Sequence, residues 1–207
     1  MKVLKLACGV LLLAGLSTVS AAELVSNGDL ELSNIGPVFF KSVPAGDNSL
    51  TNWIVTSPVS GAGIDIVTNR TGQTQFVNTG QQAVDLAGTP GPASITQTLT
   101  TVAGANYTLS FSLSSNGTEK TNGVTVLWGG TPVATLSSPA LGTWTPFSYL
   151  LTATGTSTAL TFQGNISGNQ GSLLDTISVQ DAISGVPEPA TFALVGAALL
   201  LVRKLRR

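Results

Sequence analysis

Apolar and hydroxyl side chains alternate with a period of two along most of this chain, and this pattern constrains the fold more than any other feature. Successive side chains of a β-strand point to opposite faces of the sheet, so alternation predicts strands with one buried face. The clearest run is 107–113, where Tyr, Leu, Phe and Leu alternate with Thr and Ser. Shorter runs with the same pattern are Ile95/Leu99, Val124/Val126/Trp128, Phe147/Tyr149/Leu151, Leu160/Phe162 and Ile177/Val179.

Glycine and asparagine separate these runs, and both residues favour tight turns. They stand at Gly104, 116–117, 129–130, Gly142 and 164–165. No stretch between the runs carries a convincing 3.6-residue apolar stripe. Only 9% of the residues are charged, against roughly 25% in an average soluble domain, and surface helices need many more Glu, Lys, Arg and Gln. The sequence therefore predicts an all-β domain built as an antiparallel β-sandwich.

The few ionisable residues exclude several classes of function. Residues 23–186 hold three basic and nine acidic side chains, a net charge of −6. No basic stripe is present for phosphates, so we expect no nucleic-acid partner. Histidine is absent and Cys8 is the single cysteine, which excludes a Ser–His–Asp triad and a His/Cys zinc site.

The first 22 residues are typical of a secretory signal peptide. Lys2 and Lys5 form a positive start, 6–16 is apolar, and small residues at Ala21 and Ala22 offer the cleavage site. Two alternatives are a lipoprotein attached through Cys8 and a buried N-terminal helix. We predict a signal helix over 1–22 and a mature chain that begins near residue 23.

The C-terminal segment, 186–207, is set apart by its composition. Thirteen uncharged residues, 190–202, are shorter than the about 20 needed for a full membrane span. The prolines that precede them block helix formation there. Basic residues after the run favour the cytoplasmic side, which leaves 23–189 outside. The basic residues are Arg203, Lys204, Arg206 and Arg207.

This order of features resembles the PEP-CTERM sorting signal of Gram-negative bacteria. The motif is Val186, Pro187, Glu188 and Pro189, followed by a short apolar helix and a basic tail. The resemblance implies processing by exosortase, transient anchoring in the inner membrane through 190–202, and delivery to the cell envelope or extracellular matrix. A plain C-terminal membrane anchor is the alternative.

The remaining residues, 23–185, are predicted to form one β-sandwich domain. An ordered set of short segments resembles the choice-of-anchor C family, which is related to DUF642 and to carbohydrate-binding-module jelly rolls. The segments are 27–31, 50–53, 63–67, 82–88, 95–98, 103–107, 160–162 and 174–179. This resemblance implies a jelly roll of the galactose-binding type. The family often has a tryptophan before the Asp-Leu strand, where this chain has Gln75 and Phe76.

A structural calcium ion is one candidate ligand. Glu31 and Asp175 lie on the predicted first and last strands, which are neighbours in a jelly roll, where many carbohydrate-binding modules hold calcium. The ion needs six to eight oxygen ligands, and Asn27, Gly28 and Asp29 are further candidates. The alternative is that both carboxylates accept hydrogen bonds from backbone amides.

Two further candidates for a functional site are a pair of acids and a tryptophan. Asp65 and Asp85 form the one pair of acids on adjacent-looking strands, as a glycosidase would require. Each lies between apolar neighbours, so we expect outward carboxylates on an open, wet surface with unperturbed titration, and no catalytic residue. Trp144, after the turn at Gly142, is the candidate for stacking on a sugar ring, with core or rim packing as the alternative.

The favoured interpretation is a non-catalytic exported surface or matrix protein, sorted by exosortase and associated with exopolysaccharide in a biofilm matrix. The first alternative is a carbohydrate-binding module with defined sugar specificity, which requires an exposed aromatic platform. The second is a glycoside hydrolase, which requires a cleft with two carboxylates.

Overall fold

A computed structural model of the chain describes residues 21–117, 122–166 and 170–182. This described part contains strands and turns and no helix, which confirms the all-β prediction. None of its segments forms a helix long and apolar enough to cross a membrane. The helices predicted within 1–22 and 190–202 lie outside the described residues, apart from Ala21 and Ala22. The strands are β1 (Phe40–Pro44), β2 (Ile54–Thr56), β3 (Gly63–Thr68), β4 (Gln82–Gly88), β5 (Ser94–Thr100), β6 (Asn106–Ser115), β7 (Gly123–Trp128), β8 (Thr131–Ser137), β9 (Thr145–Thr152), β10 (Ser157–Gly164) and β11 (Ser172–Asp181).

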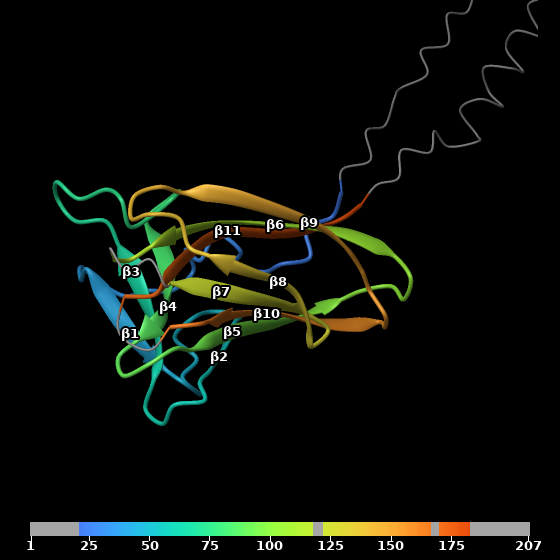
Figure 1. Cartoon of the computed structure of the whole chain (residues 1–207), viewed down its shortest axis with the longest axis horizontal. Coiled ribbons are helices and arrows are strands. Elements are labelled where there is room, and N and C mark those ends of the chain that lie inside the picture. Colours follow the sequence, from blue (N-terminus) through green and yellow to red (C-terminus); the bar gives the residue numbers. More distant parts are fainter. Residues whose placement is uncertain (1–20, 118–121, 167–169, 183–207) are drawn as a thin grey trace, which may run out of the picture.

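The strands form two sheets that pack face to face (Figure 1). The six-stranded sheet has the order β1-β3-β4-β11-β6-β9, and the five-stranded sheet has the order β2-β5-β10-β7-β8. Every strand pair between neighbours is antiparallel. The last strand, β11, lies inside the six-stranded sheet, hydrogen-bonded to β4 on one side and β6 on the other. The predicted antiparallel β-sandwich is therefore confirmed.

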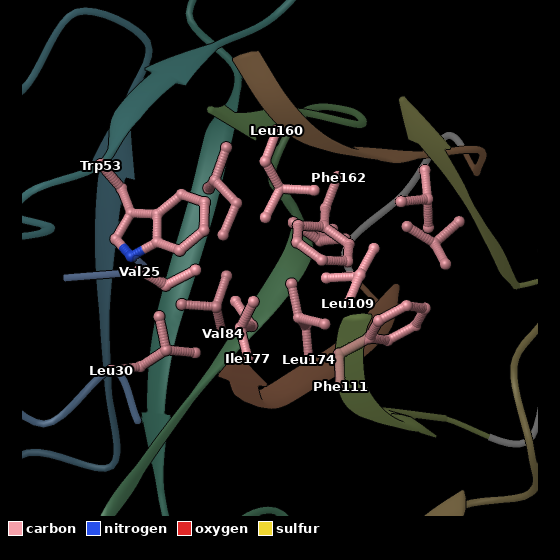
Figure 2. Close-up of a cluster of buried hydrophobic side chains, with 14 of the residues drawn as sticks. Val25, Leu30, Trp53, Val84, Leu109, Phe111, Leu160, Phe162, Leu174 and Ile177 are labelled. Carbon is pink, nitrogen blue, oxygen red and sulfur yellow. The ribbon is translucent and has the colours of Figure 1, made fainter. Parts of the chain in front are cut away.

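The core lies between the two sheets and is made by the alternating residues identified in the sequence. Leu109 and Phe111 of β6 and Leu160 and Phe162 of β10 are almost fully buried. Figure 2 shows their side chains converging from the two layers. The Phe111 and Phe162 rings meet edge to face with 5.0 Å between centroids, a geometry that adds about 0.5–1.5 kcal/mol beyond area burial.

Trp53 and Trp128 belong to this core, and each satisfies its indole N–H. Trp53 Nε1 donates to Asn27 O at 3.0 Å, and Trp128 Nε1 donates to Thr152 O at 3.0 Å. The first of these bonds joins the N-terminal segment to the core. A buried indole without such an acceptor would be costly, so these tryptophans are structural.

The N-terminal segment runs beside the last strand, but residues 27–31 form a turn instead of the predicted first strand. Glu23 forms an isolated bridge with Gln180, and Leu24 N donates to Val179 O at 2.9 Å. The chain then turns with Asn27 and Leu30 at positive φ, 56° and 61°. The first strand of the structure, β1, lies at the edge of its sheet. Ile177 N of β11 donates to Gly28 O at 2.8 Å, so the predicted first strand, 27–31, does lie beside the last strand, but as a turn and not as a strand.

Candidate functional site

The two predicted terminal signals are only partly within the described residues. Ala21 is half-buried and Ala22 is exposed, immediately before Glu23 enters its bridge with Gln180. The sorting motif Val186–Pro189, the apolar run 190–202 and the basic residues from Arg203 to Arg207 lie outside the described residues. Cleavage after Ala22 and sorting therefore stay predictions.

Glu31 and Asp175 bind the same short segment, 78–82, from two sides. Asp175 Oδ2 accepts hydrogen bonds from the backbone N–H of Asn78 and Thr79 at 3.0 and 3.1 Å. Glu31 Oε1 accepts from Gln81 N and Gln82 N at 2.7 and 2.8 Å. Gly80 lies between these contacts with a positive φ of 69°, which favours glycine, and a Cβ there would also displace the Glu31 carboxylate.

The oxygens proposed for calcium are largely committed to backbone donors. Asp175 Oδ1 accepts from Thr176 N, so three of the four carboxylate oxygens in the pair already face N–H groups. Asn27 Oδ1 accepts from Leu32 N, and Gly28 O accepts from Ile177 N. Among the described residues, no three His, Cys, Asp or Glu side chains are grouped as a metal site. A calcium ion here would have to displace these backbone donors, and calcium binding stays a prediction.

Asp65 on β3 and Asp85 on β4 are direct cross-strand partners. Asp85 is fully buried, with Oδ1 accepting from Ala87 N and Gly171 N at 2.9 and 3.0 Å, and Oδ2 accepting from Asn116 Nδ2 at 2.5 Å. Asp65 is half-buried and accepts from Ser42 Oγ at 2.6 Å. The expectation of two carboxylates on an open, wet surface is therefore wrong for Asp85.

Burial also overturns the expectation of unperturbed titration. Burial raises the pKa of Asp85 to about 7, although the hydrogen bonds from Asn116 and Ala87 N lower it. Burial raises the pKa of Asp65 as well. Acids with perturbed pKa values occur in glycosidases, but here both oxygens of Asp85 already accept protein donors. A Cβ at Gly171 would lie 2.5 Å from Asp85 Oδ1. Asp85 on β4 therefore holds two loops in place, through its hydrogen bonds with Asn116 and Gly171.

Trp144 packs in a small second cluster of apolar residues away from the main core. Its indole is half-buried, and Nε1 donates to Gln75 O at 3.2 Å. The buried members of this cluster are Val67, Phe76, Val77, Ala83 and Leu173, with Phe39, Leu141 and Trp144 packed against them. Trp144 does not line either groove described below, and sugar stacking on it stays a prediction.

A groove of about 710 Å³ lies beside this second cluster. Three stretches of chain line it, namely 34–39 before β1, 68–71 from the last residue of β3 onward, and Gln81 with Gln82 at the start of β4. The tight turn 70–73 is closed by two backbone hydrogen bonds of 2.9 Å between Arg70 and Gln73. Thr68 N donates to Phe39 O at 2.8 Å and fixes the first two stretches to each other.

The groove combines one guanidinium, several amides and an aromatic ring. The Arg70 guanidinium carbon lies 3.4 Å from the centre of the Phe39 ring. Phe39 meets Phe76 edge to face at 5.0 Å, which ties this ring to the second cluster. Gln82 Nε2 donates to Ser33 O at 2.8 Å, while its Oε1 is buried without a hydrogen-bond partner among the described residues. Because this oxygen has almost no exposed surface, it does not contact a ligand in the groove, whereas the side chains of Asn34 and Gln81 are exposed.

A smaller groove of about 500 Å³ lies between the N-terminal segment and β5. Its main amide, Gln97, already accepts from Ser26 N and donates to Ser26 O and Asn52 O at 2.8–2.9 Å. The larger groove therefore has the better chemistry for a ligand.

The larger groove was not predicted from the sequence. Phe39 and Arg70 lie far apart in the chain and meet through the pairing of β1 with β3. The scarcity of basic residues could have pointed to this groove, because Arg70, which lines it, is one of only three basic residues in 23–186.

The family described as "Protein of unknown function (DUF642)" matches residues 23–180 of this chain. No curated protein matches the sequence. Several solved structures resemble the fold at low sequence identity.

One is TmCBM61 in complex with β-1,4-galactotriose, at 14% identity and a TM-score of 0.53, over 77% of this chain and 99% of that one. A second is the enzymatically active domain of tailspike protein 4 from bacteriophage CBA120, at 15% identity and a TM-score of 0.50, over 76% and 21%. A third is a family 35 carbohydrate-binding module from Clostridium thermocellum, at 16% identity and a TM-score of 0.46, over 69% and 98%. At these identities, the first two similarities establish the fold alone.

Proposed function

Through residues 23–180 this chain belongs to the DUF642 family, and from this family, the sandwich and the larger groove we propose that it is a non-catalytic carbohydrate-binding protein. The observation that carries the proposal is the groove itself. It offers exposed planar amides and a guanidinium on an aromatic ring. Convergent polar groups beside an apolar wall are typical of sites that bind small polar ligands such as sugars.

The similar structures support the same proposal by analogy. The TmCBM61 structure is a complex with a galactotriose, and its whole length is covered by the match. Fold similarity is an associational argument, because one fold hosts many functions. The sugar specificity therefore has to come from the groove of this chain.

A hydrolase is the second candidate, favoured by the facing acids Asp65 and Asp85 and by the resemblance to an enzymatically active tailspike domain. Two carboxylates of a glycosidase must both reach the scissile bond. Asp85 has no exposed surface and accepts three hydrogen bonds from the protein. These contacts support a non-catalytic role for this pair.

Removing two exposed amides from the groove is expected to weaken glycan binding about tenfold. Each net hydrogen bond contributes about 0.5–1.5 kcal/mol, and 1.4 kcal/mol corresponds to a factor of ten in Kd. The variant is Asn34→Ala with Gln81→Ala, both of which line the larger groove. A glycan array identifies ligands, and calorimetry with calcium and with chelator then measures affinity.

The matched control replaces Thr98 and Thr100 with alanine, since both are exposed and line the smaller groove. We expect the control to bind like the parent protein. If the control loses affinity while the Asn34/Gln81 variant keeps it, the site is in the other groove. Failure of all glycans to bind would reject the function.

We also propose export and sorting, from the end segments of the sequence. Intact mass of protein released from the cell surface is expected to correspond to a chain starting near Glu23 and ending near Pro187. Association with exopolysaccharide follows if the groove binds that polymer. Recovery of mature surface protein that still carries 203–207 would reject sorting by exosortase.

A further inference from the structure

Arg70 is isolated as a cation in an acidic molecule. The described residues contain two basic side chains, Lys41 and Arg70, and eight acidic ones. Among the described residues that line the larger groove, none is acidic, and Arg70 is the only one with a formal charge. The Glu31 carboxylate does not line the groove, and its Oε1 accepts from the backbone N–H groups of Gln81 and Gln82. Arg70 is therefore the one charged side chain of the described groove lining.

The guanidinium of Arg70 is held in place without using its hydrogen-bond donors. Its carbon lies 3.4 Å from the Phe39 ring centre, within the range of a cation–π contact. Within residues 21–117, 122–166 and 170–182, no acceptor bonds to its N–H groups. A guanidinium presents a planar fork that matches a carboxylate with two parallel hydrogen bonds. Stacking on Phe39 orients that fork before any ligand arrives.

Exposed amides supply the complementary groups. The side chains of Asn34 and Gln81 are exposed and line the same groove as Arg70. An amide offers both donors and an acceptor, so it can bond the hydroxyls of a sugar ring. A ligand that uses the guanidinium and these amides carries a carboxylate and hydroxyl groups on one unit.

We propose that the larger groove selects sugars that carry a carboxylate, that is, uronic-acid units of a polysaccharide. The carboxylate accepts from the Arg70 guanidinium, and ring hydroxyls bond the exposed amides of Asn34 and Gln81. This inference rests on the proposed function and adds the class of sugar.

The test compares uronates with their methyl esters, which keep the ring and the linkage and remove the charge. The ligands are polygalacturonate, alginate and the free uronic acids, each with its ester, and a sulfated galactan is added as a different anion. Calorimetry on the purified protein is expected to show at least one uronate that binds about tenfold or more tightly than its ester. Arg70→Gln should abolish this difference.

Lys41→Gln removes the other described cation, which lies on β1 and does not line the groove. It should leave the preference unchanged. Thr71→Asp adds a negative charge to the groove without touching the ring stack, and should also abolish uronate binding. It serves as a second test if Arg70→Gln fails to fold.

Other outcomes reject the inference in distinguishable ways. Equal binding of uronates and esters rejects the carboxylate preference and leaves carbohydrate binding standing. If Arg70→Gln and Lys41→Gln lose the same affinity for uronates, binding reflects unspecific attraction between charges. If the sulfated galactan binds as tightly as the uronates, the groove selects for negative charge alone. Absence of binding to any glycan, charged or neutral, rejects both proposals.

Discussion

Replacing Asp85 with asparagine is expected to stabilise the protein above pH 7 and to reduce the dependence of its unfolding free energy on pH. Burial raises the pKa of Asp85 from its ordinary value of 3.8 to about 7 in the folded state. Each unit of difference between folded and unfolded states corresponds to about 1.4 kcal/mol, so the shift represents about 4 kcal/mol.

The sign follows from proton binding. Because the folded state holds its proton more tightly, the contribution of Asp85 is fully present below pH 3.8 and is lost as the pH rises through about 7. The parent protein should therefore lose unfolding free energy between pH 4.5 and 8. Asparagine keeps an oxygen for Ala87 N and Gly171 N and cannot ionise, so the variant should lose much less over the same range.

Urea unfolding at pH 4.5, 6 and 8 measures both proteins. A smaller slope should remain in the variant, because burial also raises the pKa of Asp175, to about 6. Asp65→Asn is the graded control: it removes the charge that faces Asp85 across the strands, and should have a smaller effect. Parallel stability curves for the parent and Asp85→Asn would contradict the burial of an ionised carboxylate.

Replacing Asp175 with alanine is expected to lower the unfolding free energy by about 3 kcal/mol. Asp175 has no exposed surface and accepts from the N–H groups of Asn78, Thr79 and Thr176. Leaving a buried donor unsatisfied costs about 1–3 kcal/mol for each group, and removing an ionised buried carboxylate at neutral pH offsets part of that cost. Urea unfolding measures the change.

Asp175→Asn provides the matched control, since its side-chain oxygen still accepts from Asn78 and Thr79. We expect it to lose about 1 kcal/mol or less. Hydrogen exchange of the Asn78 and Thr79 amides should accelerate in the alanine variant and change little in the asparagine variant. Equal exchange in both variants would show that segment 78–82 is held by other contacts. Glycan binding should weaken in the alanine variant, because Gln81 and Gln82 line the groove.

The strands with strict alternation were predictable because burial of one face imposes that pattern. Residues 107–113 form β6, and 95–99, 124–128 and 147–151 lie in β5, β7 and β9. By contrast, β1 and β8 were not predicted. Both are edge strands that carry a proline, and edge strands lack the two-sided pairing and burial that impose a clear signal.

The burial of Asp85 was not predicted, because alternation with a period of two does not determine whether a side chain is exposed. Asp85 does point away from its apolar neighbours on β4, as the alternation requires. The outer face of the sheet is covered at that point by loop residues, including Asn116 and Gly171. Alternation gives the face of a side chain, whereas its exposure depends on distant loops. The groove was missed for the same reason, since strand pairing brings its three stretches together.

The position of β11 determines the order in which the domain can fold. Without this last strand, the six-stranded sheet consists of two pieces, β1-β3-β4 and β6-β9, with no pairing between them. The N-terminal segment also depends on β11, because Glu23 and Leu24 pair with residues near the end of that strand. Pairing between distant parts of a chain is slow, since loop closure precedes the contacts that reward it. We therefore expect the two pieces of the six-stranded sheet to pair only after residues 172–181 have been synthesised, so that docking of β11 is a late step in folding.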